Sequence, residues 1–269
     1  MNIQKISFWL SILFIPFHVS SQDSTFQLIN TIPITADFFT TDKLQQIYIV
    51  TNSNTIIKFS PDGLEQYRFS NNTLGDLGYI DATDPFNLLL YYPDYQLVVT
   101  LDRTLNQTGK LSLIDAGVVQ ARTVGLSNDG NIWVYDEASF QLRKFSRTGE
   151  VLFESQNLSL VLGKAPQPVQ IIDRENWVYL NDPAQGILVF DNFGQYSKTI
   201  PIKNRQTFQL LDNHLIFKQK GQIELYDLKS FLSATLALPA NIVETDQIQI
   251  QKNRLFVKKS NAIEIYSWK

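Results

Sequence analysis

The chain is built from short apolar runs that alternate with turn-forming segments. Within residues 122–154, four such runs follow one another, and the segments between them are SNDGN, DEAS and SRTG. Asn, Asp, Ser and Gly form tight turns at low cost, and Gly130 and Gly149 can adopt a positive φ without strain. The pattern predicts a four-stranded antiparallel meander. Its expected strands are Thr123–Leu126, Ile132–Tyr135, Phe140–Phe145 and Val151–Glu154.

The same unit recurs along the chain, and its second strand defines the period. The second-strand anchors lie 38 to 45 residues apart. They are Ile47, Leu88, Ile132, Trp177, Leu215 and Leu255. This period with four strands per unit is typical of a β-propeller, whereas leucine-rich and ankyrin repeats are shorter and armadillo-type repeats need helices. The sequence therefore predicts an all-β, six-bladed β-propeller with four-stranded antiparallel blades.

The sixth unit contains only three predicted strands, DQIQIQ, RLFVKK and AIEIYSW. An isolated apolar run, Phe26–Ile34, precedes the first unit and has no hairpin partner beside it. Pro33 within this run fits an edge strand, because proline cannot donate a hydrogen bond to a central ladder. We expect this N-terminal strand to complete the last blade as its outermost strand. The ring would then be closed by main-chain hydrogen bonds.

The first residues have the features of an export signal. Lys5 is followed by the apolar run Ile6–Phe17 and then by small residues, which predicts a signal peptide that ends near Gln22. The run is short for a membrane span, although an N-terminal anchor is the alternative. We expect a signal peptide over residues 1–22, a single propeller domain over residues 23–269 and no membrane span after cleavage. The expected location is the periplasm or the cell surface after Sec export, with association with the outer membrane as a further expectation.

Composition narrows the classes of function. Hydrophobic residues make up 44% of the chain and charged residues 18%, which suits a folded protein with a sizeable core. The chain has no cysteine, which excludes disulfides, thiolate catalysis, cysteine metal ligands and a lipoprotein anchor. The formal charge is −3 and no basic run is visible, so nucleic acid is not an expected partner. We expect the protein to be a monomer on its own.

The sequence offers little catalytic chemistry. It contains no nucleophile elbow, phosphate-binding glycine loop or histidine-pair zinc motif. His214 is the single histidine after residue 22, and its position in a predicted turn favours a solvated residue over a catalytic one. Carboxylates near strand ends could face a channel and hold calcium, but aspartate also suits turns on its own account. These carboxylates are Asp81, Asp84, Asp173, Asp182 and Asp212. We assign no catalytic residue, no metal ligand and no cofactor.

Two stretches are candidates for contact with a protein partner. Residues 90–95 place three tyrosines around a tight turn, and tyrosine is favoured at interfaces. The alternative is that these tyrosines pack between blades. Residues 157–166 form the longest expected connection between blades, which is apolar enough to cover one mouth of the ring or to dock on another protein. The candidate partner-binding residues are Tyr91, Tyr92, Pro93, Tyr95, Leu158, Leu160, Val161 and Leu162.

Two segments, Asp84–Tyr92 and Leu101–Asn106, carry a resemblance to a known family. With GLSNDGNIWVYDEASFQLRKF, which follows them, they resemble the small six-bladed propellers exported by bacteria that use the type IX secretion system. The export signal, the predicted ring and the missing catalytic set favour a non-enzymatic periplasmic interaction module. The resemblance implies a plug or accessory subunit of the type IX translocon, with an outer-membrane secretion barrel as its protein partner. Two alternatives stay open, namely a calcium-dependent propeller hydrolase or lactonase and a glycan- or small-molecule-binding propeller.

Overall fold

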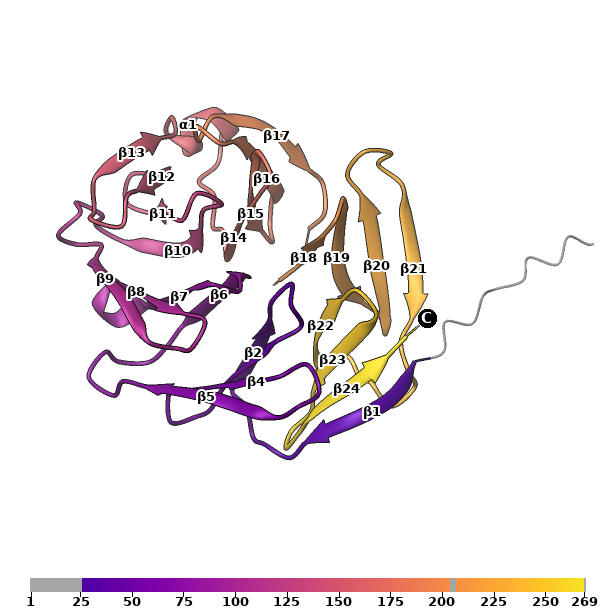
Figure 1. Cartoon of the computed structure of the whole chain (residues 1–269). Coiled ribbons are helices and arrows are strands. Elements are labelled where there is room, and N and C mark those ends of the chain that lie inside the picture. The colour runs from indigo at the N-terminus through magenta and orange to yellow at the C-terminus, as the bar shows by residue number, and fades with distance from the viewer. Residues whose placement is uncertain (1–25, 204–206, 269) are drawn as a thin grey trace, which may run out of the picture.

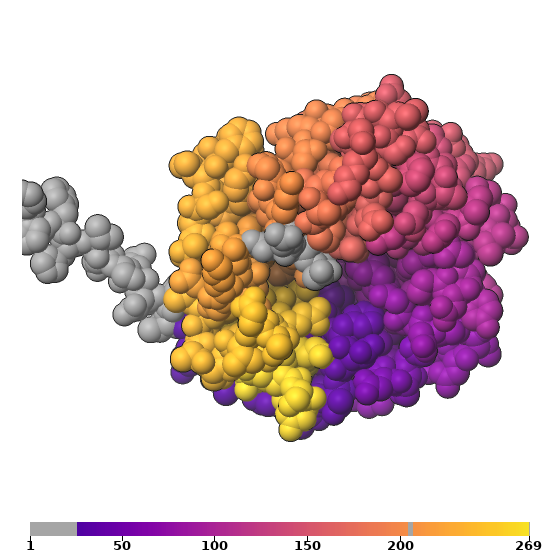
Figure 2. Space-filling view, turned by 180° about the vertical axis from the view of Figure 1, so that it is seen from behind, coloured from indigo at the N-terminus to yellow at the C-terminus, as the bar shows by residue number. Residues whose placement is uncertain are grey.

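The strands of this protein form a closed ring of six sheets (Figure 1). The computed structural model describes residues 26–203 and 207–268, so the predicted signal peptide lies outside the described residues. In these residues, 24 strands form six four-stranded antiparallel sheets. The prediction of an all-β, six-bladed propeller is confirmed. The space-filling view from behind shows neighbouring blades in contact around the ring (Figure 2).

The first three blades are consecutive meanders in which the first strand is innermost. Blade 1 consists of β2 (Phe38–Thr41), β3 (Ile47–Val50), β4 (Thr55–Phe59) and β5 (Glu65–Ser70). Blade 2 consists of β6 (Tyr79–Asp84), β7 (Asn87–Tyr92), β8 (Leu97–Asp102) and β9 (Gln107–Ser112). Blade 3 consists of β10 (Ala121–Leu126), β11 (Ile132–Asp136), β12 (Gln141–Phe145) and β13 (Val151–Glu154). A one-turn 3-10 helix, η1 (Pro93–Tyr95), joins β7 to β8.

The other three blades follow the same plan. Blade 4 consists of β14 (Gln170–Arg174), β15 (Trp177–Asp182), β16 (Gly186–Asp191) and β17 (Tyr196–Ile200). Blade 5 consists of β18 (Gln209–Leu211), β19 (His214–Gln219), β20 (Gln222–Asp227) and β21 (Ser233–Ala237). Blade 6 contains β22 (Gln247–Gln251), β23 (Arg254–Lys258) and β24 (Ile263–Ser267).

The N-terminal strand completes blade 6, as the sequence predicts. Strand β1 (Gln27–Ile32) pairs antiparallel with β24 and forms the outer edge of the sheet β1-β24-β23-β22. Figure 1 shows β1 and β24, from the two ends of the chain, side by side. Ile32 is buried and belongs to an apolar cluster that also contains Phe39 of blade 1 and Phe256 of blade 6. The strand therefore contributes both main-chain pairing and one core side chain to the junction that closes the ring.

Apolar side chains hold the blades together. Six clusters of buried residues each combine side chains from two neighbouring blades. Tyr48 of blade 1 and Tyr92 of blade 2 share one cluster, and Trp133 of blade 3 and Phe190 of blade 4 share another. Burying one large apolar side chain is worth about 1.5–3 kcal/mol, so each interface contributes several such terms. Second strands pack on neighbours at both faces, which explains why β3 and β11 are buried at every position.

The connection between blades 3 and 4 contains a short helix where the sequence indicated a loop. Helix α1 (Leu158–Leu162) begins after Asn157, whose side chain accepts a hydrogen bond from Leu160 N. It ends at Gly163, which has φ of 69°. An Asn cap before the helix and a left-handed Gly after it are the usual signals of helix ends. Among residues 26–203 and 207–268, no helix has the length and apolar character needed to span a membrane.

Candidate functional site

The two ends of the ring are distinct surfaces. Because consecutive strands are antiparallel, their turns alternate between the two ends of each blade. We call the end with the turns between first and second strands and between third and fourth strands the hairpin face. The opposite end, which we call the connection face, carries the turns between second and third strands and the links from blade to blade.

A cavity of about 950 Å³ lies at the centre of the ring. Its wall is formed by the first strands of five blades and their adjoining residues, together with Asn128 of blade 3. Glutamine and threonine make up most of its polar lining residues, and Phe38 and Tyr79 add half-buried aromatic surface. Its glutamines are Gln170, Gln209, Gln247, Gln249 and Gln251.

Two of these glutamines bind the backbone of the next blade in the same way. Gln170 donates to Phe208 O and accepts from Phe208 N, with both distances 3.1 Å. Gln209 repeats the arrangement with Ile250, donating to its carbonyl at 3.3 Å and accepting from its N–H at 2.8 Å. The channel side of a first strand is a sheet edge, so its N–H and C=O groups have no strand partner there. The carboxamides supply that partner and join blade 4 to blade 5 and blade 5 to blade 6.

The junction between blades 6 and 1 uses single glutamine bonds. Gln247 donates to Phe39 O and Gln251 donates to Thr41 Oγ1, both at 3.3 Å. Gln249 lies between these two glutamines on β22 and also lines the channel. Within the described residues its side chain makes no hydrogen bond, so its carboxamide is available to a molecule in the channel.

Two of the predicted channel aspartates join blades in the same manner. Asp81 is buried and accepts a hydrogen bond from Leu126 N of blade 3 at 2.8 Å. Burial raises the pKa of Asp81 above its ordinary value, although the hydrogen bonds from Leu126 and Thr83 act to lower it. Asp173 is also buried and accepts from Ser127 Oγ at 2.7 Å and from Trp133 Nε1 at 2.9 Å. Both carboxylates therefore serve the contacts of blade 3 with its two neighbours.

The remaining candidate carboxylates occupy turns. Asp84 accepts from Phe86 N, and Asp182 accepts from Gln167 N and from the backbone of its own turn. Asp212 is exposed in the turn between β18 and β19. The described residues contain no group of three or more His, Cys, Asp or Glu side chains arranged to hold a metal ion. The calcium-dependent hydrolase stays a prediction that no arrangement in this part of the chain favours.

His214 begins β19 at the hairpin face and does not line the channel cavity. Its side chain is 41% exposed, and its Nε2 lies 3.3 Å from Asp227 Oδ2. Hydrogen bonds from the backbone N–H groups of Ser230 and Lys229 lower the pKa of Asp227. The histidine is therefore a partly solvated residue beside an ionised carboxylate, in agreement with its interpretation as a turn residue.

The tyrosine stretch is divided between core and surface. Tyr91 and Tyr92 are 3% and 1% exposed, and the Tyr91 hydroxyl donates to Ala121 O at 2.6 Å. These two follow the alternative interpretation, packing between blades, and are not available to a partner in the monomer. Pro93 and Tyr95 are exposed on the connection face, Tyr95 by 59%.

Helix α1 is divided in the same way. Leu158 is fully buried in the cluster between blades 3 and 4, and Leu162 packs against that cluster. Leu160 is 82% exposed and Val161 is 41% exposed. The helix therefore caps the interface of two blades on the connection face, and only its Leu160 and Val161 side remains open to a partner.

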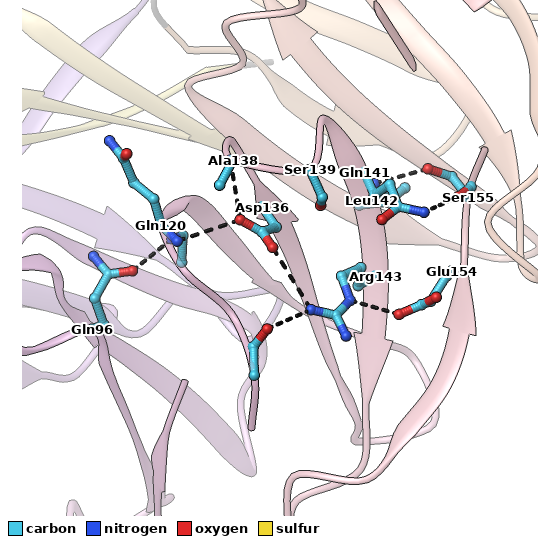
Figure 3. Close-up of polar contacts among 12 residues, drawn as sticks. Gln96, Gln120, Asp136, Ala138, Ser139, Gln141, Leu142, Arg143, Glu154 and Ser155 are labelled. Carbon is cyan, nitrogen blue, oxygen red and sulfur yellow. Dashed lines mark hydrogen bonds and ion pairs between the residues drawn. The ribbon is translucent and has the colours of Figure 1, made fainter. Parts of the chain in front are cut away.

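A polar network connects these two stretches across blade 3 (Figure 3). Gln96, which follows Tyr95, accepts from the backbone of β10, and Gln120 N donates to the buried Asp136. Arg143 lies between Asp136 and Glu154, at 3.7 Å and 2.9 Å respectively. The network links the surface around Tyr95 to the segment before α1, so the two stretches belong to one connected part of the connection face.

Sequence analysis missed a third surface, which lies on the hairpin face. Turns or strand ends at this face present large apolar side chains in blades 1, 2, 4 and 5, each between 40% and 70% exposed. We call this set the apolar tips. Its members are Leu44, Leu64, Phe86, Trp177, Phe193, Phe231 and Leu232. The signal was present in the turn motifs PDGL, DPF, DNFG and KSFL, where an apolar residue stands in or next to a turn that needs none.

A groove of about 200 Å³ opens between blades 4 and 5 near the apolar tips. Trp177 and Tyr179 of β15 line it, and Arg174, Glu175 and Leu210 line both this groove and the central channel. The groove thus continues outward from the channel at the hairpin face.

No family model matches the chain, and no curated protein matches it. Solved structures do. The β-propeller domain of Myceliophteria thermophila Cps50 (Swd1) has a TM-score of 0.61 at 9% identity, covering 90% of this chain and 99% of that one. A streptogramin B lyase structure has a TM-score of 0.57 at 14% identity, covering 86% and 78%. BBS1N in complex with ARL6DN has a TM-score of 0.55 at 12% identity, covering 91% and 97%. At such identities these likenesses establish the propeller fold alone.

Proposed function

We propose that this protein is a non-enzymatic interaction module that binds another protein through its hairpin face. The observation that carries the proposal is the set of apolar tips. Soluble monomers rarely collect large exposed apolar side chains on one surface, and those that do so commonly use the surface for binding. Aromatic residues in particular are enriched at the centres of protein interfaces.

Two of the apolar tips, Phe86 and Phe231, occupy turn positions at which a polar residue would satisfy the backbone equally well. Phe86 lies in the two-residue turn between β6 and β7, and Phe231 lies in the turn between β20 and β21. Turn geometry is satisfied by small polar residues, and these aromatics leave more than half of their surface in water. Burial against a protein partner would account for their exposure on the hairpin face.

Two tips are also held in place in the monomer. The Phe193 ring packs edge-on against Phe153, with centroids 5.3 Å apart and an interplanar angle of 88°. Lys198 Nζ lies 5.2 Å from the centroid of the Phe231 ring. Side chains that are already ordered lose less conformational entropy on binding, which favours affinity. One of the similar propellers, BBS1N, was solved bound to a protein, ARL6DN, which is the same use of this architecture.

The test compares two triple variants of the chain from residue 23 to residue 269. One variant changes tips, Phe86→Ser, Phe193→Ser and Phe231→Ser, and the matched control changes the connection face, Tyr95→Ser, Leu160→Ser and Val161→Ser. Both sets are exposed, so both variants should melt within a few degrees of the wild type. Affinity purification with mass spectrometry should recover a specific partner with the wild type and the control and lose it with the tip variant. Loss with the control alone would move the site to the connection face and overturn the proposal.

The finer proposal names the partner as part of the outer-membrane type IX secretion machine, in which the propeller acts as a plug or accessory subunit. It is supported by the sequence resemblance of Asp84–Tyr92 and Leu101–Asn106 and by the predicted export signal. Purification of the tagged protein from envelope membranes of its natural host tests it. Co-purification of a large secretion barrel is expected, and recovery of free monomer only would contradict it.

A second candidate function, binding of a glycan or another small neutral molecule, is favoured by the channel. The cavity of about 950 Å³ is large enough for a small ligand and offers the Gln249 carboxamide and the Tyr79 ring. A ligand that binds the folded state raises the melting temperature. Neutral oligosaccharides should then stabilise the wild type and not a Gln249→Trp variant, and an unchanged melting temperature across the panel would remove this candidate.

A further inference from the structure

We propose that the groove between blades 4 and 5 binds an acidic segment of the protein partner, with a carboxylate seated beside an apolar side chain. This inference rests on the proposed function, since the groove opens among the apolar tips. It adds that the bound segment of the partner is negatively charged, which the apolar tips by themselves do not specify.

The walls of the groove come from both blades. β15 and β16 of blade 4 contribute the apolar residues Trp177, Tyr179 and Val189, and blade 5 contributes Leu210 and Leu228. Trp177 is 40% exposed, so its ring is partly open to solvent within the groove. A volume of about 200 Å³ accommodates one or two amino-acid side chains but not a folded element. The groove has the size of an anchor pocket for a short segment.

Positive charge is in excess at the groove. Arg174, Lys198 and Lys229 line it, against the two acidic residues Glu175 and Asp212. None of the three basic side chains forms an ion pair with a carboxylate in the described part of the chain. Among the other 17 Lys and Arg side chains of the described residues, six form such pairs and eleven do not, so the groove is distinguished by gathering three unpaired cations in one place. Those paired residues are Arg68, Arg122, Arg143, Lys144, Arg254 and Lys259.

Unpaired basic side chains around an apolar pocket fit an anionic group better than a neutral one. The whole chain has a formal charge of −3, so these cations stand against the overall charge and create a local attraction for carboxylates. Lys198 is held near the Phe231 ring, which orients its ammonium group at the rim. The same overall charge repels a long polyanion, which favours a protein segment over a nucleic acid.

The Trp177 ring makes the groove observable by fluorescence. The chain after residue 22 contains two other tryptophans, Trp133 and Trp268. Trp133 is fully buried between blades 3 and 4, and Trp268 follows β24 in blade 6. A ligand in the groove should change the emission of Trp177, and a Trp177→Phe variant should abolish that change while the melting temperature stays close to the wild-type value.

The experiment titrates residues 23–269 with two capped peptides that lack tryptophan, Glu-Leu-Glu-Leu-Glu and its neutral counterpart Gln-Leu-Gln-Leu-Gln. The acidic peptide should bind with a dissociation constant of about 1 mM or below and at least about tenfold more tightly than the neutral one. Raising the salt concentration should weaken it. A Lys198→Ala, Lys229→Ala variant should lose the binding, whereas the matched exposed pair Lys220→Ala, Lys252→Ala should keep it.

Calorimetry on the same samples detects binding that leaves the Trp177 emission unchanged. Three outcomes overturn the inference. They are equal binding of the two peptides, retention of binding by the Lys198 and Lys229 variant, and absence of both heat and fluorescence change for the acidic peptide. The peptide result is independent of the tip variant. If the acidic peptide binds but the Phe86, Phe193 and Phe231 variant keeps its partner, the proposed function fails and the groove assignment stands. If that variant loses its partner but the acidic peptide does not bind, only the groove assignment is rejected.

Discussion

Closure of the ring by β1 can be tested with one buried and one exposed isoleucine of the same strand. Ile32 is 6% exposed and packs in the cluster between blades 6 and 1, whereas Ile29 is 45% exposed on the outer edge. Both belong to β1 and both would be replaced by alanine. Both substitutions remove the same side-chain atoms, but Ile32 is buried and paired with Ile263, whereas Ile29 is exposed at the register irregularity between Leu28 and Asn30.

The magnitudes follow from that burial. Ile32→Ala removes three carbon groups from the core at about 0.8 kcal/mol each, which gives about 2.4 kcal/mol before any cavity term. With the cavity, the expected loss in free energy of unfolding is about 3 kcal/mol, within the range of about 2–5 kcal/mol for such changes. Because about half of Ile29 is already in water, Ile29→Ala should cost no more than about 1 kcal/mol. The corresponding shift in melting temperature for Ile32→Ala is about 6–12 °C.

Urea unfolding followed by far-UV circular dichroism and by tryptophan fluorescence measures these losses. Trp268 packs against the cluster between blades 5 and 6, with its ring centroid 6.2 Å from that of Phe26, the residue before β1, so its fluorescence reports on detachment of the N-terminal strand. A deletion of residues 26–34 should destabilise the protein by more than Ile32→Ala, because it also removes the pairing with β24. If Ile32→Ala and Ile29→Ala agree within about 0.5 kcal/mol, or if the deletion leaves the melting temperature unchanged, β1 does not close the ring energetically.

Three further changes test the contacts inside the ring. Gln170→Ala leaves a backbone N–H and C=O without partners and should cost about 2–4 kcal/mol in urea unfolding, against less than about 0.5 kcal/mol for Gln249→Ala; equal losses would contradict the clamp. Gly186→Ala places a Cβ 2.5 Å from a carbonyl oxygen at φ of 116° and should lower the melting temperature by several degrees, and a neutral result would show that the turn adjusts freely. For Asp129, burial is the largest single influence and opposes ionisation, but the hydrogen bonds from Lys144, Asn131 and Ser127 together outweigh it and lower the pKa to about 2. Asp129→Asn should therefore cost at most about 1 kcal/mol at pH 7, a difference present above pH 3.8 and lost as the pH falls toward 2; a difference that persists at pH 2 would contradict the ion pair.

The repeat was readable from the sequence because each blade needs the same two signals. Second strands are buried on both faces, so they appear as continuous apolar runs, and the turns between strands are rich in Gly, Asp, Asn and Ser. The anchors Ile47, Ile132 and Trp177 are the first residues of β3, β11 and β15. The missing strand of blade 6 was equally visible, because an isolated apolar run and an incomplete unit stood at opposite ends of the chain. Whether residues 1–22 are a signal peptide stays a prediction, since they lie outside the described residues.

The surfaces were less readable, for a physical reason. In a free-standing sheet, adjacent residues point to opposite faces, so one of Tyr91 and Tyr92 would be exposed. In a propeller both faces of a second strand pack against neighbouring blades, and both tyrosines are buried. Only the turn residues Pro93 and Tyr95 escape this constraint. In the connection of residues 157–166, the apolar pattern reflected a one-turn helix that buries Leu158, and helix and loop cannot be separated by periodicity over so few residues.

The glutamine contacts and the apolar tips illustrate opposite limits of sequence reasoning. The sequence does not distinguish a first-strand glutamine that binds a neighbouring backbone, as Gln170 does, from one whose side chain lines the channel without a partner, as Gln249 does. The difference depends on the spacing of blades that only the closed ring defines. Phe86 and Phe193, by contrast, stand in turn motifs that Asp, Asn, Pro and Gly already explain, so the turn pattern by itself does not indicate whether the aromatic side chain is buried or exposed.

The distribution of satisfied and unsatisfied groups leads from fold to function. Asp81 and Asp173 form hydrogen bonds that join blade 3 to its neighbours. Gln170 and Gln209 form hydrogen bonds that join blades 4, 5 and 6. Polar groups that stabilise the ring in this way are costly to recruit for chemistry, because removing a buried partner leaves its donor or acceptor unpaired. The groups that the ring does not need include the apolar tips and the unpaired basic side chains of the adjoining groove, as well as Tyr95, Leu160 and Val161 on the connection face. The tips and the groove both stand on the hairpin face, and the proposed binding of an acidic, partly apolar protein segment would account for both with one partner.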